Sequence, residues 1–332
     1  MSDRPRVSGI GSMPGTDVRE AGRMVRDLLG ENDIPFLPEL PARGPGADLV
    51  GRAATALVGL SVDLQPSGWR LTDAAGVDAR RARSYLRNDL DGLAEAFDGY
   101  VGPLKLQWCG PWTLAASVEL PRGERALTDD GATRDLVQSV AESALKHASA
   151  VQRLVPGAEL IMQWDEPGLP AVLGGRLPTA SGYGRVRAVD QARVVEGLEA
   201  VASALRAVVP HQILHCCAPG VPVPLVRRVD DLALAIDTSL IHTRQWDGVA
   251  ELVESGRSLW TGVLPTDGTV TRPEQVADPL LRAWEQVGLE SAALEQVVLT
   301  PACGLASTAP REVPRTFRLL QEAAALLAAR TA

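Results

Sequence analysis

The chain alternates short apolar segments with amphipathic stretches along its whole length, and this alternation limits the possible folds more than any other feature. Eight segments are predicted to be β-strands, because each is short, apolar or β-branched, and followed by polar or turn residues. They span residues 6–12, 34–40, 103–109, 159–165, 211–217, 232–238, 258–264 and 296–302.

Amphipathic helices are predicted between these strands, where apolar residues recur at spacings of three and four. Clear examples span residues 17–30, 132–155, 189–209 and 273–288. Asp17 and Asp190 stand in N-capping positions, and Gly30 ends the first helix. Repeated strand–helix units predict a parallel sheet, and eight strands favour a closed (β/α)8 TIM barrel over an open doubly wound sheet. A β-hairpin-like insertion between strands two and three is expected around a turn at Pro66-Ser67-Gly68.

The composition agrees with a single domain over residues 1–332. The chain has 332 residues, of which 45% are hydrophobic, and its net charge of −8 gives no reason to expect a nucleic-acid partner. Its N-terminal residues do not resemble a secretory signal, and no apolar run has membrane-spanning length. Four cysteines in so long a chain do not form a disulfide framework, so we expect a reducing, cytoplasmic location and no membrane partner.

Polar side chains follow every predicted strand. In a TIM barrel, the carboxyl ends of the strands and the loops after them form the active site. We therefore expect these residues to gather at one end of the barrel. They are Ser12, Glu39, Cys109, Asp165, Glu166, His215, Cys217, Asp237, Asp267 and Cys303.

His215, Cys217 and Cys303 have the side chains that hold zinc. Alternate residues of an extended segment face the same way, so His215 and Cys217 can converge while Cys216 points into the core. Cys303 follows the last predicted strand and can supply a third ligand. The alternative is that these cysteines only fill core space, as buried cysteines often do.

Three carboxylates at strand ends have two possible roles each. Asp237 is either a fourth, oxygen ligand of the metal or the N-cap of the next helix. Asp165 and Glu166 precede Pro167, which keeps Glu166 extended, so that the two side chains diverge. One of them can bind a substrate ammonium group or handle a proton, and the alternative is a capping acid beside a solvated neighbour.

These motifs, in this order, resemble the catalytic barrel of the cobalamin-independent methionine synthase family, a group of zinc-dependent thiol methyltransferases. The resemblance runs over nearly the whole chain and is most specific at the His-x-Cys, Asp-Glu-Pro and Cys-Gly motifs. The similar segments are IGSMPGT at 10–16, ELPARGPGADLVG at 39–51, SGW at 67–69, GPWTLA at 110–115, WDEP at 164–167, HCC at 215–217 and PACGL at 301–305.

The resemblance implies zinc on His215, Cys217 and Cys303, with Asp237 where the family has a glutamate. It also implies that Ile10, Ser12, Glu39 and Asp165 bind the amino-acid part of homocysteine. Asp165 and Asp267 are the candidate catalytic acids. Asp267 lies near the position where the family has a histidine after the seventh strand. A metal-bound thiol is deprotonated, and the thiolate can then attack a methyl donor.

The sequence departs from the family at positions that contact folate. A family tryptophan falls at Ser117, and a family glutamate falls near Ala171. The expected function is methylation of homocysteine to methionine, with homocysteine and a methyl donor as partners. Two alternatives remain: methyl transfer from a corrinoid protein or another donor to a small thiol, and a non-catalytic zinc- or thiol-binding barrel.

Overall fold

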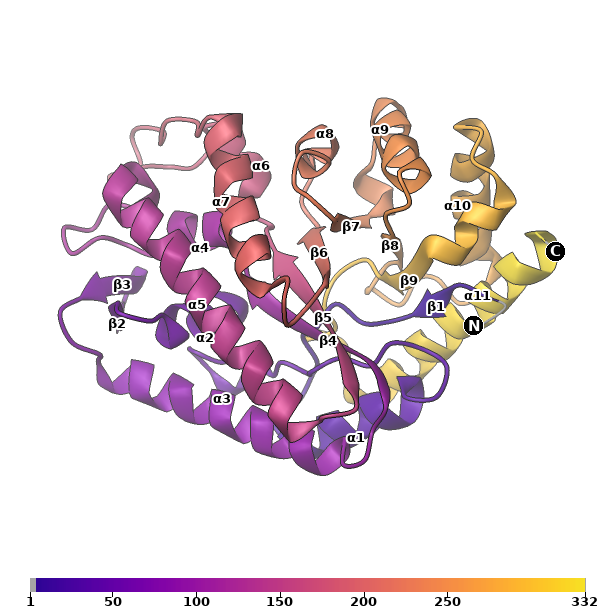
Figure 1. Ribbon diagram of the computed structural model, residues 1–332, viewed down its shortest axis with the longest axis horizontal. Helices are drawn as coiled ribbons and strands as arrows, with labels where there is room; N and C mark the ends of the chain where they lie inside the picture. Colours follow the sequence, from indigo (N-terminus) through magenta and orange to yellow (C-terminus); the bar gives the residue numbers. More distant parts are fainter. Residues whose placement is uncertain (1–3, 332) are drawn as a thin grey trace.

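The computed structural model describes residues 4–331, which form a curled parallel sheet surrounded by helices (Figure 1). The sheet has seven strands in the order β1-β9-β8-β7-β6-β5-β4, and every neighbouring pair is parallel. The strands are β1 (Arg6–Val7), β4 (Gly102–Cys109), β5 (Ala158–Asp165), β6 (His211–Cys216), β7 (Leu232–Asp237), β8 (Leu259–Leu264) and β9 (Val297–Pro301). The α/β architecture with a parallel sheet is confirmed, and strands β4 to β9 lie within one residue of their predicted ends.

The first two predicted strands are shorter than expected. β1 has only two residues, and the segment 34–40 contains no regular strand but isolated parallel bridges. In the segment 34–40, Pro35 and Pro38 prevent a regular strand, because a proline has no N–H to donate to a strand ladder. The remaining N–H groups pair on both sides: that of Ile34 donates to Val7 O at 2.9 Å, and that of Leu37 donates to Lys105 O at 2.9 Å. Residues 34–39 therefore lie between the edge strands β1 and β4.

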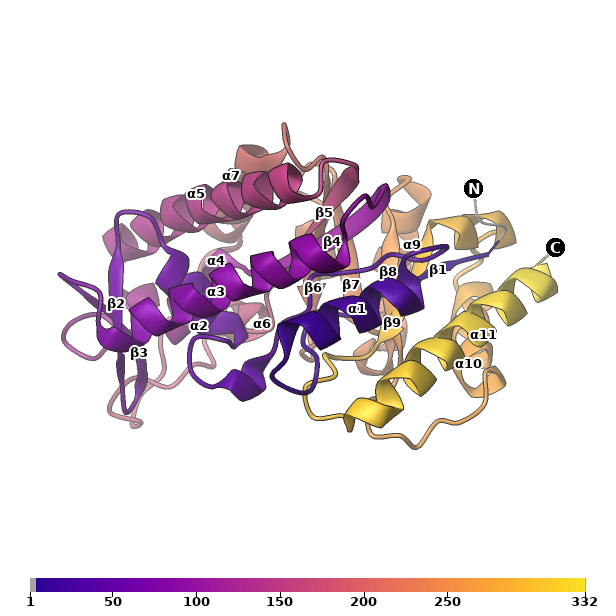
Figure 2. The ribbon, with the colours of Figure 1, turned by 90° about the horizontal axis from the view of Figure 1, so that it is seen from below.

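An antiparallel pair of strands stands apart from the main sheet. β2 (Ser61–Gln65) pairs with β3 (Gly68–Thr72), and Gln65 lies opposite Gly68. The pair precedes β4 in the chain and follows the segment 34–39, and Figure 2 shows it at one end of the molecule.

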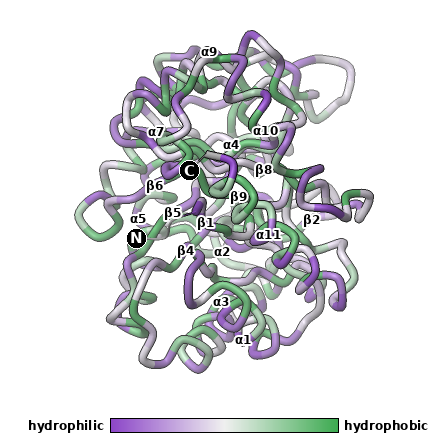
Figure 3. The backbone as a smooth tube through the Cα atoms, turned by 90° about the vertical axis from the view of Figure 1, so that its right-hand side faces the viewer, coloured by the Kyte–Doolittle hydropathy of each residue, from purple (hydrophilic) through white to green (hydrophobic). Residues whose placement is uncertain are grey.

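The helices pack one beside another around the sheet (Figures 1 and 2). The N-caps predicted at Asp17 and Asp190 are confirmed, since both carboxylates accept backbone N–H groups of their helices. Gln321 Nε2 in the last helix donates to Leu28 O in the first helix at 2.9 Å, so these two helices are joined by a hydrogen bond. Figure 3 shows both termini on one side of the molecule. The helices are α1 (Val18–Leu29), α2 (Leu49–Ala56), α3 (Val77–Ala96), α4 (Pro111–Ser117), α5 (Asp130–Leu154), α6 (Leu169–Leu173), α7 (Gln191–Leu205), α8 (Val223–Val226), α9 (Thr243–Glu254), α10 (Glu274–Gln286) and α11 (Val313–Thr331).

The core has two parts that place the strand ends. The larger one fills the space between the sheet and the helices, and the buried Cys216 belongs to it as predicted. The smaller one comprises Ile34, Ile213, Ala233, Ala235, Trp260 and Val298. Because Ile213 and His215 are alternate residues of β6, they share the face of the sheet opposite to Cys216. No helix within residues 4–331 is long and apolar enough to cross a membrane.

Candidate active site

The carboxyl ends of β4, β5 and β6 bring three predicted residues side by side. Cys109 lies opposite Asp165, and Asp165 lies opposite His215. Ser12 and Glu39 form a bridge of their own at the corresponding ends of the first two segments. The parallel register therefore places these strand-end residues side by side at one edge of the sheet.

His215 is held by Asp165 at the end of the sheet. His215 Nδ1 lies 2.7 Å from Asp165 Oδ1, and both side chains are buried. The other ring nitrogen, Nε2, is buried and has no hydrogen-bond partner within the described chain. A histidine bound through one nitrogen to a carboxylate, with the other nitrogen free, has the arrangement typical of a metal ligand.

Cys217 and Cys303 meet although 86 residues separate them in the chain. Their sulfur atoms are 3.9 Å apart and share a hydrogen bond. This bond lowers the pKa of Cys303 to about 6, with help from the Gly304 N–H and from His215, and it raises the pKa of Cys217. The pair therefore favours one thiolate, the form in which cysteine binds metals.

The donor set fits a zinc ion. Two thiolates on a tetrahedral zinc at roughly 2.3 Å each stand about 3.8 Å apart, close to the sulfur separation seen here. The free Nε2 of His215 supplies the type of nitrogen ligand that completes such a set. Over residues 4–331, however, no three His, Cys, Asp or Glu side chains already stand together as a metal-binding group. The fit therefore rests on the sulfur pair and the unpartnered nitrogen.

Asp237 takes the second of its two predicted roles. It ends β7 and caps the short 3-10 helix Thr238–Leu240. Its Oδ1 accepts from the Ser239 N–H at 2.9 Å and from the Ser239 hydroxyl at 2.6 Å. These bonds occupy one carboxylate oxygen, and the role of metal ligand stays a prediction.

Glu39 is a buried carboxylate with a guanidinium partner. Its Oε1 lies 3.1 Å from Arg52 Nε of α2, which is itself buried and also paired with Asp89. Burial raises the pKa of Glu39 to about 7, although the Arg52 charge opposes this shift.

Ser12 and Ile10 lie beside the other candidates. Gly304, the residue after Cys303, packs so closely on Ser12 that an added Cβ would stand 1.9 Å from Ser12 Oγ. The Leu305 N–H also donates to Ser12 O at 2.8 Å. The Ile10 carbonyl accepts from Lys105 Nζ and Gln163 Nε2, so it points toward the side chains of β4 and β5.

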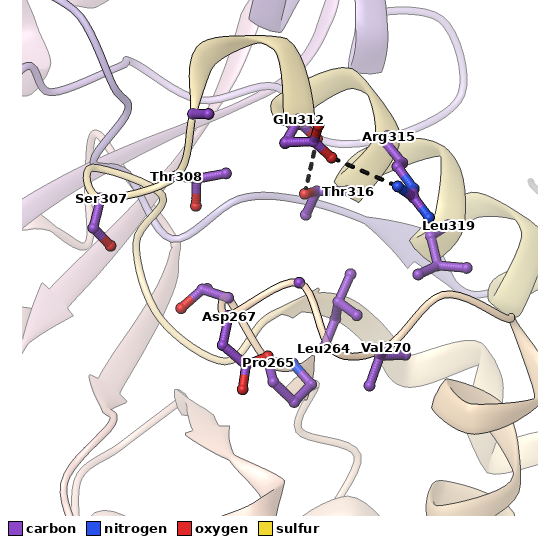
Figure 4. Close-up of a pocket in the computed structure, with 13 residues that line it drawn as sticks. Leu264, Pro265, Asp267, Val270, Ser307, Thr308, Glu312, Arg315, Thr316 and Leu319 are labelled. Atoms are coloured by element: carbon purple, nitrogen blue, oxygen red, sulfur yellow. Dashed lines mark hydrogen bonds and ion pairs between the residues drawn. The ribbon is translucent and has the colours of Figure 1, made fainter.

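Asp267 is not brought together with the other predicted site residues. It lies after β8 at a cavity of about 390 Å³, shown in Figure 4, which it lines with Thr308, Glu312 and Arg315. Hydrogen bonds from the Thr269 hydroxyl and N–H hold its Oδ1 and lower its pKa. Neither this cavity nor the hydrogen bonds of Asp267 include His215 or either site cysteine within the described chain.

Glu166 is a capping acid, which was the alternative considered for it, but its neighbour Asp165 is buried rather than solvated. Its carboxylate accepts from the N–H groups of Trp112 and Thr113, at 2.9 and 2.7 Å, and from the Thr113 hydroxyl. Burial raises its pKa to about 7 against these bonds. Glu166 therefore fixes the start of α4 after the end of β4.

Lys105 was not among the site residues predicted from the sequence. It is completely buried on β4, and its Nζ donates to Ile10 O and Gln163 Oε1, each at 2.8 Å. Burial lowers its pKa to about 7, although the charges of Asp165 and Glu39 oppose this shift. Its signal in the sequence is the polar alternation of Lys105 and Gln107 inside an otherwise apolar strand.

Comparison with a solved structure of similar length agrees with this fold. A solved B12-independent methionine synthase from Shewanella sp. W3-18-1, in complex with selenomethionine, superposes with a TM-score of 0.64 over 98% of both chains at 14% identity. Methylaspartate ammonia lyase from Clostridium tetanomorphum gives a TM-score of 0.47 at 12% identity, over 98% of this chain and 60% of that one. A search of curated protein sequences gives no match.

The family model described as the catalytic domain of cobalamin-independent synthase matches residues 103–326, about two thirds of the chain. This description gives no support to a corrinoid protein as partner, because the family works without cobalamin. The matched range contains β4 to β9 and all the candidate zinc ligands. The chain belongs to the cobalamin-independent synthase catalytic-domain family.

Proposed function

We propose that this chain is a zinc-dependent S-methyltransferase that activates the thiol of homocysteine and methylates it to methionine. The observation that carries the proposal is the meeting of Cys217 and Cys303, together with the unpartnered Nε2 of His215, two residues before Cys217. Zinc bound to these residues would supply the positive charge that keeps a substrate thiol deprotonated at neutral pH. Asp165 orients the imidazole ring of His215 for this purpose.

The substrate's amino-acid part would lie against Ser12, Glu39, Asp165 and the backbone of Ile10. Support comes from the position of Ser12 beside the Cys303 loop and from the two buried carboxylates, which suit an ammonium group. Such a clamp would hold the sulfur in one place relative to the methyl donor, which reduces the entropic cost of the transfer. Asp165 and Asp267 remain proposed acids, and Asp237 remains a proposed ligand.

We further propose that residues 1–332 form one catalytic domain with the (β/α)8 barrel design, in which residues 34–39 occupy the place of an eighth strand. The hydrogen bonds of this segment to both β1 and β4 support the proposal. The antiparallel pair β2-β3 would then be an insertion between the second and third barrel positions.

Metal analysis of the purified chain tests the zinc site. We expect one zinc ion per chain in the wild type and none in Cys303→Ala. Cys216→Ala is the matched control, because Cys216 is a buried core residue next to Cys217 and should leave the zinc content unchanged. A metal-free wild-type protein would overturn the proposal.

Homocysteine binding tests the acceptor half of the reaction. Calorimetry in buffers of different ionisation enthalpy should show the release of a proton when the thiol binds. Binding without proton release would contradict thiol activation. Methyl transfer from methyltetrahydrofolate to homocysteine, followed as methionine formation, then tests the donor, and binding without turnover would instead indicate a non-catalytic thiol-binding protein.

A further inference from the structure

Lys105 is a buried cation without a direct carboxylate partner. Its side chain is fully inaccessible, and no ion pair within 4 Å involves it in the described part of the chain. All of its hydrogen bonds go to neutral acceptors: Ile10 O at 2.8 Å, Gln163 Oε1 at 2.8 Å and Gln107 Oε1 at 3.3 Å. Burying an amine without a carboxylate partner costs free energy, so packing alone does not account for a lysine at this position.

The lysine fixes the orientation of Gln163. Below its pKa of about 7, Lys105 carries an ammonium group that only donates hydrogen bonds, so the amide oxygen of Gln163 must face Lys105 and its NH2 group must face away. That NH2 group donates to Ile10 O at 2.9 Å and to Asp165 Oδ1 at 2.7 Å. A flipped amide would place donor against donor at Lys105 and acceptor against acceptor at Asp165.

The same direction of donation continues to His215. Asp165 Oδ1 accepts from Gln163, and an ionised carboxylate is only an acceptor, so the 2.7 Å contact with His215 Nδ1 is an N–H donating to oxygen. With the ring proton on Nδ1, a neutral imidazole has its lone pair on Nε2. This nitrogen is the buried ring atom that lacks a partner.

We propose that Lys105 and Gln163 are positioning residues that hold Asp165 in place and thereby select the His215 tautomer whose Nε2 can bind a metal. This inference rests on the proposed zinc site for its purpose. Its physical content, the position of one proton, can be measured without zinc.

The test uses the full chain with 15N-labelled histidine, freed of metal by chelation. The wild type should show His215 with its proton on Nδ1, read from the chemical shifts of the two ring nitrogens. Lys105→Met keeps an unbranched side chain, one atom shorter, but removes the amino group. Gln163→Met removes the amide while Lys105 keeps its bond to Ile10. Both variants should give a mixture of tautomers.

Zinc affinity, measured by competition with a chelator, gives the second result. The Kd should rise roughly tenfold in both variants, at the lower end of the effect of removing a partner of a metal-bound histidine. Gln212→Leu is the matched control. Gln212 is also a buried strand glutamine, but it donates to Ala202 O and Val209 O and accepts from Trp164 Nε1, on the face of the sheet opposite to His215, so its loss should change neither result.

The possible outcomes separate this inference from the proposed function. A wild type that binds no zinc would overturn the proposed function, while the tautomer measurement would still decide the inference. An unchanged single tautomer in both variants would overturn the inference even where zinc binds. Failure of both variants to fold would also overturn it, because the chain of hydrogen bonds would then serve stability rather than positioning.

Discussion

Asp165 and Glu166 are neighbours at the end of β5 with opposite surroundings. Successive residues of a strand point to opposite faces, so Asp165 turns toward His215 inside the sheet and Glu166 turns toward the start of α4. Both are buried, yet only Asp165 contacts a candidate metal ligand. Adjacent carboxylates therefore divide between the proposed site and the support of a helix.

Glu166→Gln and Asp165→Asn should distinguish the support of α4 from the support of the proposed metal site. The amide NH2 would face backbone N–H groups that now donate to the carboxylate, so we expect a loss of about 1–3 kcal/mol in the free energy of unfolding. Zinc content should not change. Asp165→Asn should instead weaken zinc binding by roughly 10–100-fold. Urea unfolding and chelator competition measure the two effects, and loss of zinc in Glu166→Gln at normal stability would contradict this division.

His147 should make stability depend on acid pH. It lies on α5, stacked on Trp108 at 4.7 Å, and burial lowers its pKa to about 3. The unfolded chain binds this proton near pH 6.5 and the folded chain does not, so stability falls as pH falls from about 6.5 to about 3. The slope from this group is at most about 1.4 kcal/mol per pH unit.

Unfolding free energies of wild type and His147→Phe, measured at several pH values, should differ in this slope. Buried Glu39 and Glu166 act in the opposite direction, since their raised pKa values make stability fall as pH rises from about 4.5 to about 7. The comparison between variants removes their contribution. His211→Gln, at an exposed residue, is the control, and an equal slope in all three proteins would contradict the prediction.

At the scale of elements, the periodicity of apolar residues predicted the strands and helices that have regular backbone hydrogen bonding. β4 to β9 and the capped helix α1 follow directly from apolar spacing and from Asp17. The segment 34–40 has the same apolar character, but its two prolines remove the donors that a regular strand needs. Hydropathy does not report which N–H groups are missing, so the pattern overestimated this element.

The loop after β9 depends on a glycine that no periodicity explains. Gly304→Ala would drive a methyl group into Ser12 Oγ, so the Ser12 hydroxyl must rotate out of its position or the two loops that carry Ser12 and Cys303 must separate. We expect a loss of about 1–3 kcal/mol in unfolding free energy, as for other overpacked sites, and weaker homocysteine binding. Adding Ser12→Gly removes the clashing atoms and should restore most of the stability but not the binding. Equal stability of wild type and Gly304→Ala would contradict this contact.

In the whole molecule, the candidate site joins distant parts of the chain. Ser12 comes from its beginning and Cys303 from its end, and Gln321 ties α11 to α1. Residue types at strand ends were enough to nominate the sulfur pair and His215, because metal ligands are few in kind. They also nominated Asp267, which shares a strand-end position and lines a cavity that includes neither His215 nor the two cysteines. They did not include Lys105, because it lies in the middle of β4 and its proposed role depends on hydrogen bonds to Ile10 O and Gln163.

Zinc at the proposed site should stabilise the whole fold because the proposed ligands lie at the ends of β6 and β9, which are not adjacent in the sheet. A ligand that binds only the folded chain adds about 4 kcal/mol of stability at a concentration a thousandfold above its Kd. Thermal unfolding of the wild type should therefore shift to higher Tm with added zinc and return on chelation. Cys216→Ala should show the same shift and Cys303→Ala should show none. A zinc-dependent Tm in Cys303→Ala would place the ion elsewhere, since the sulfur pair at 3.9 Å would then be incomplete.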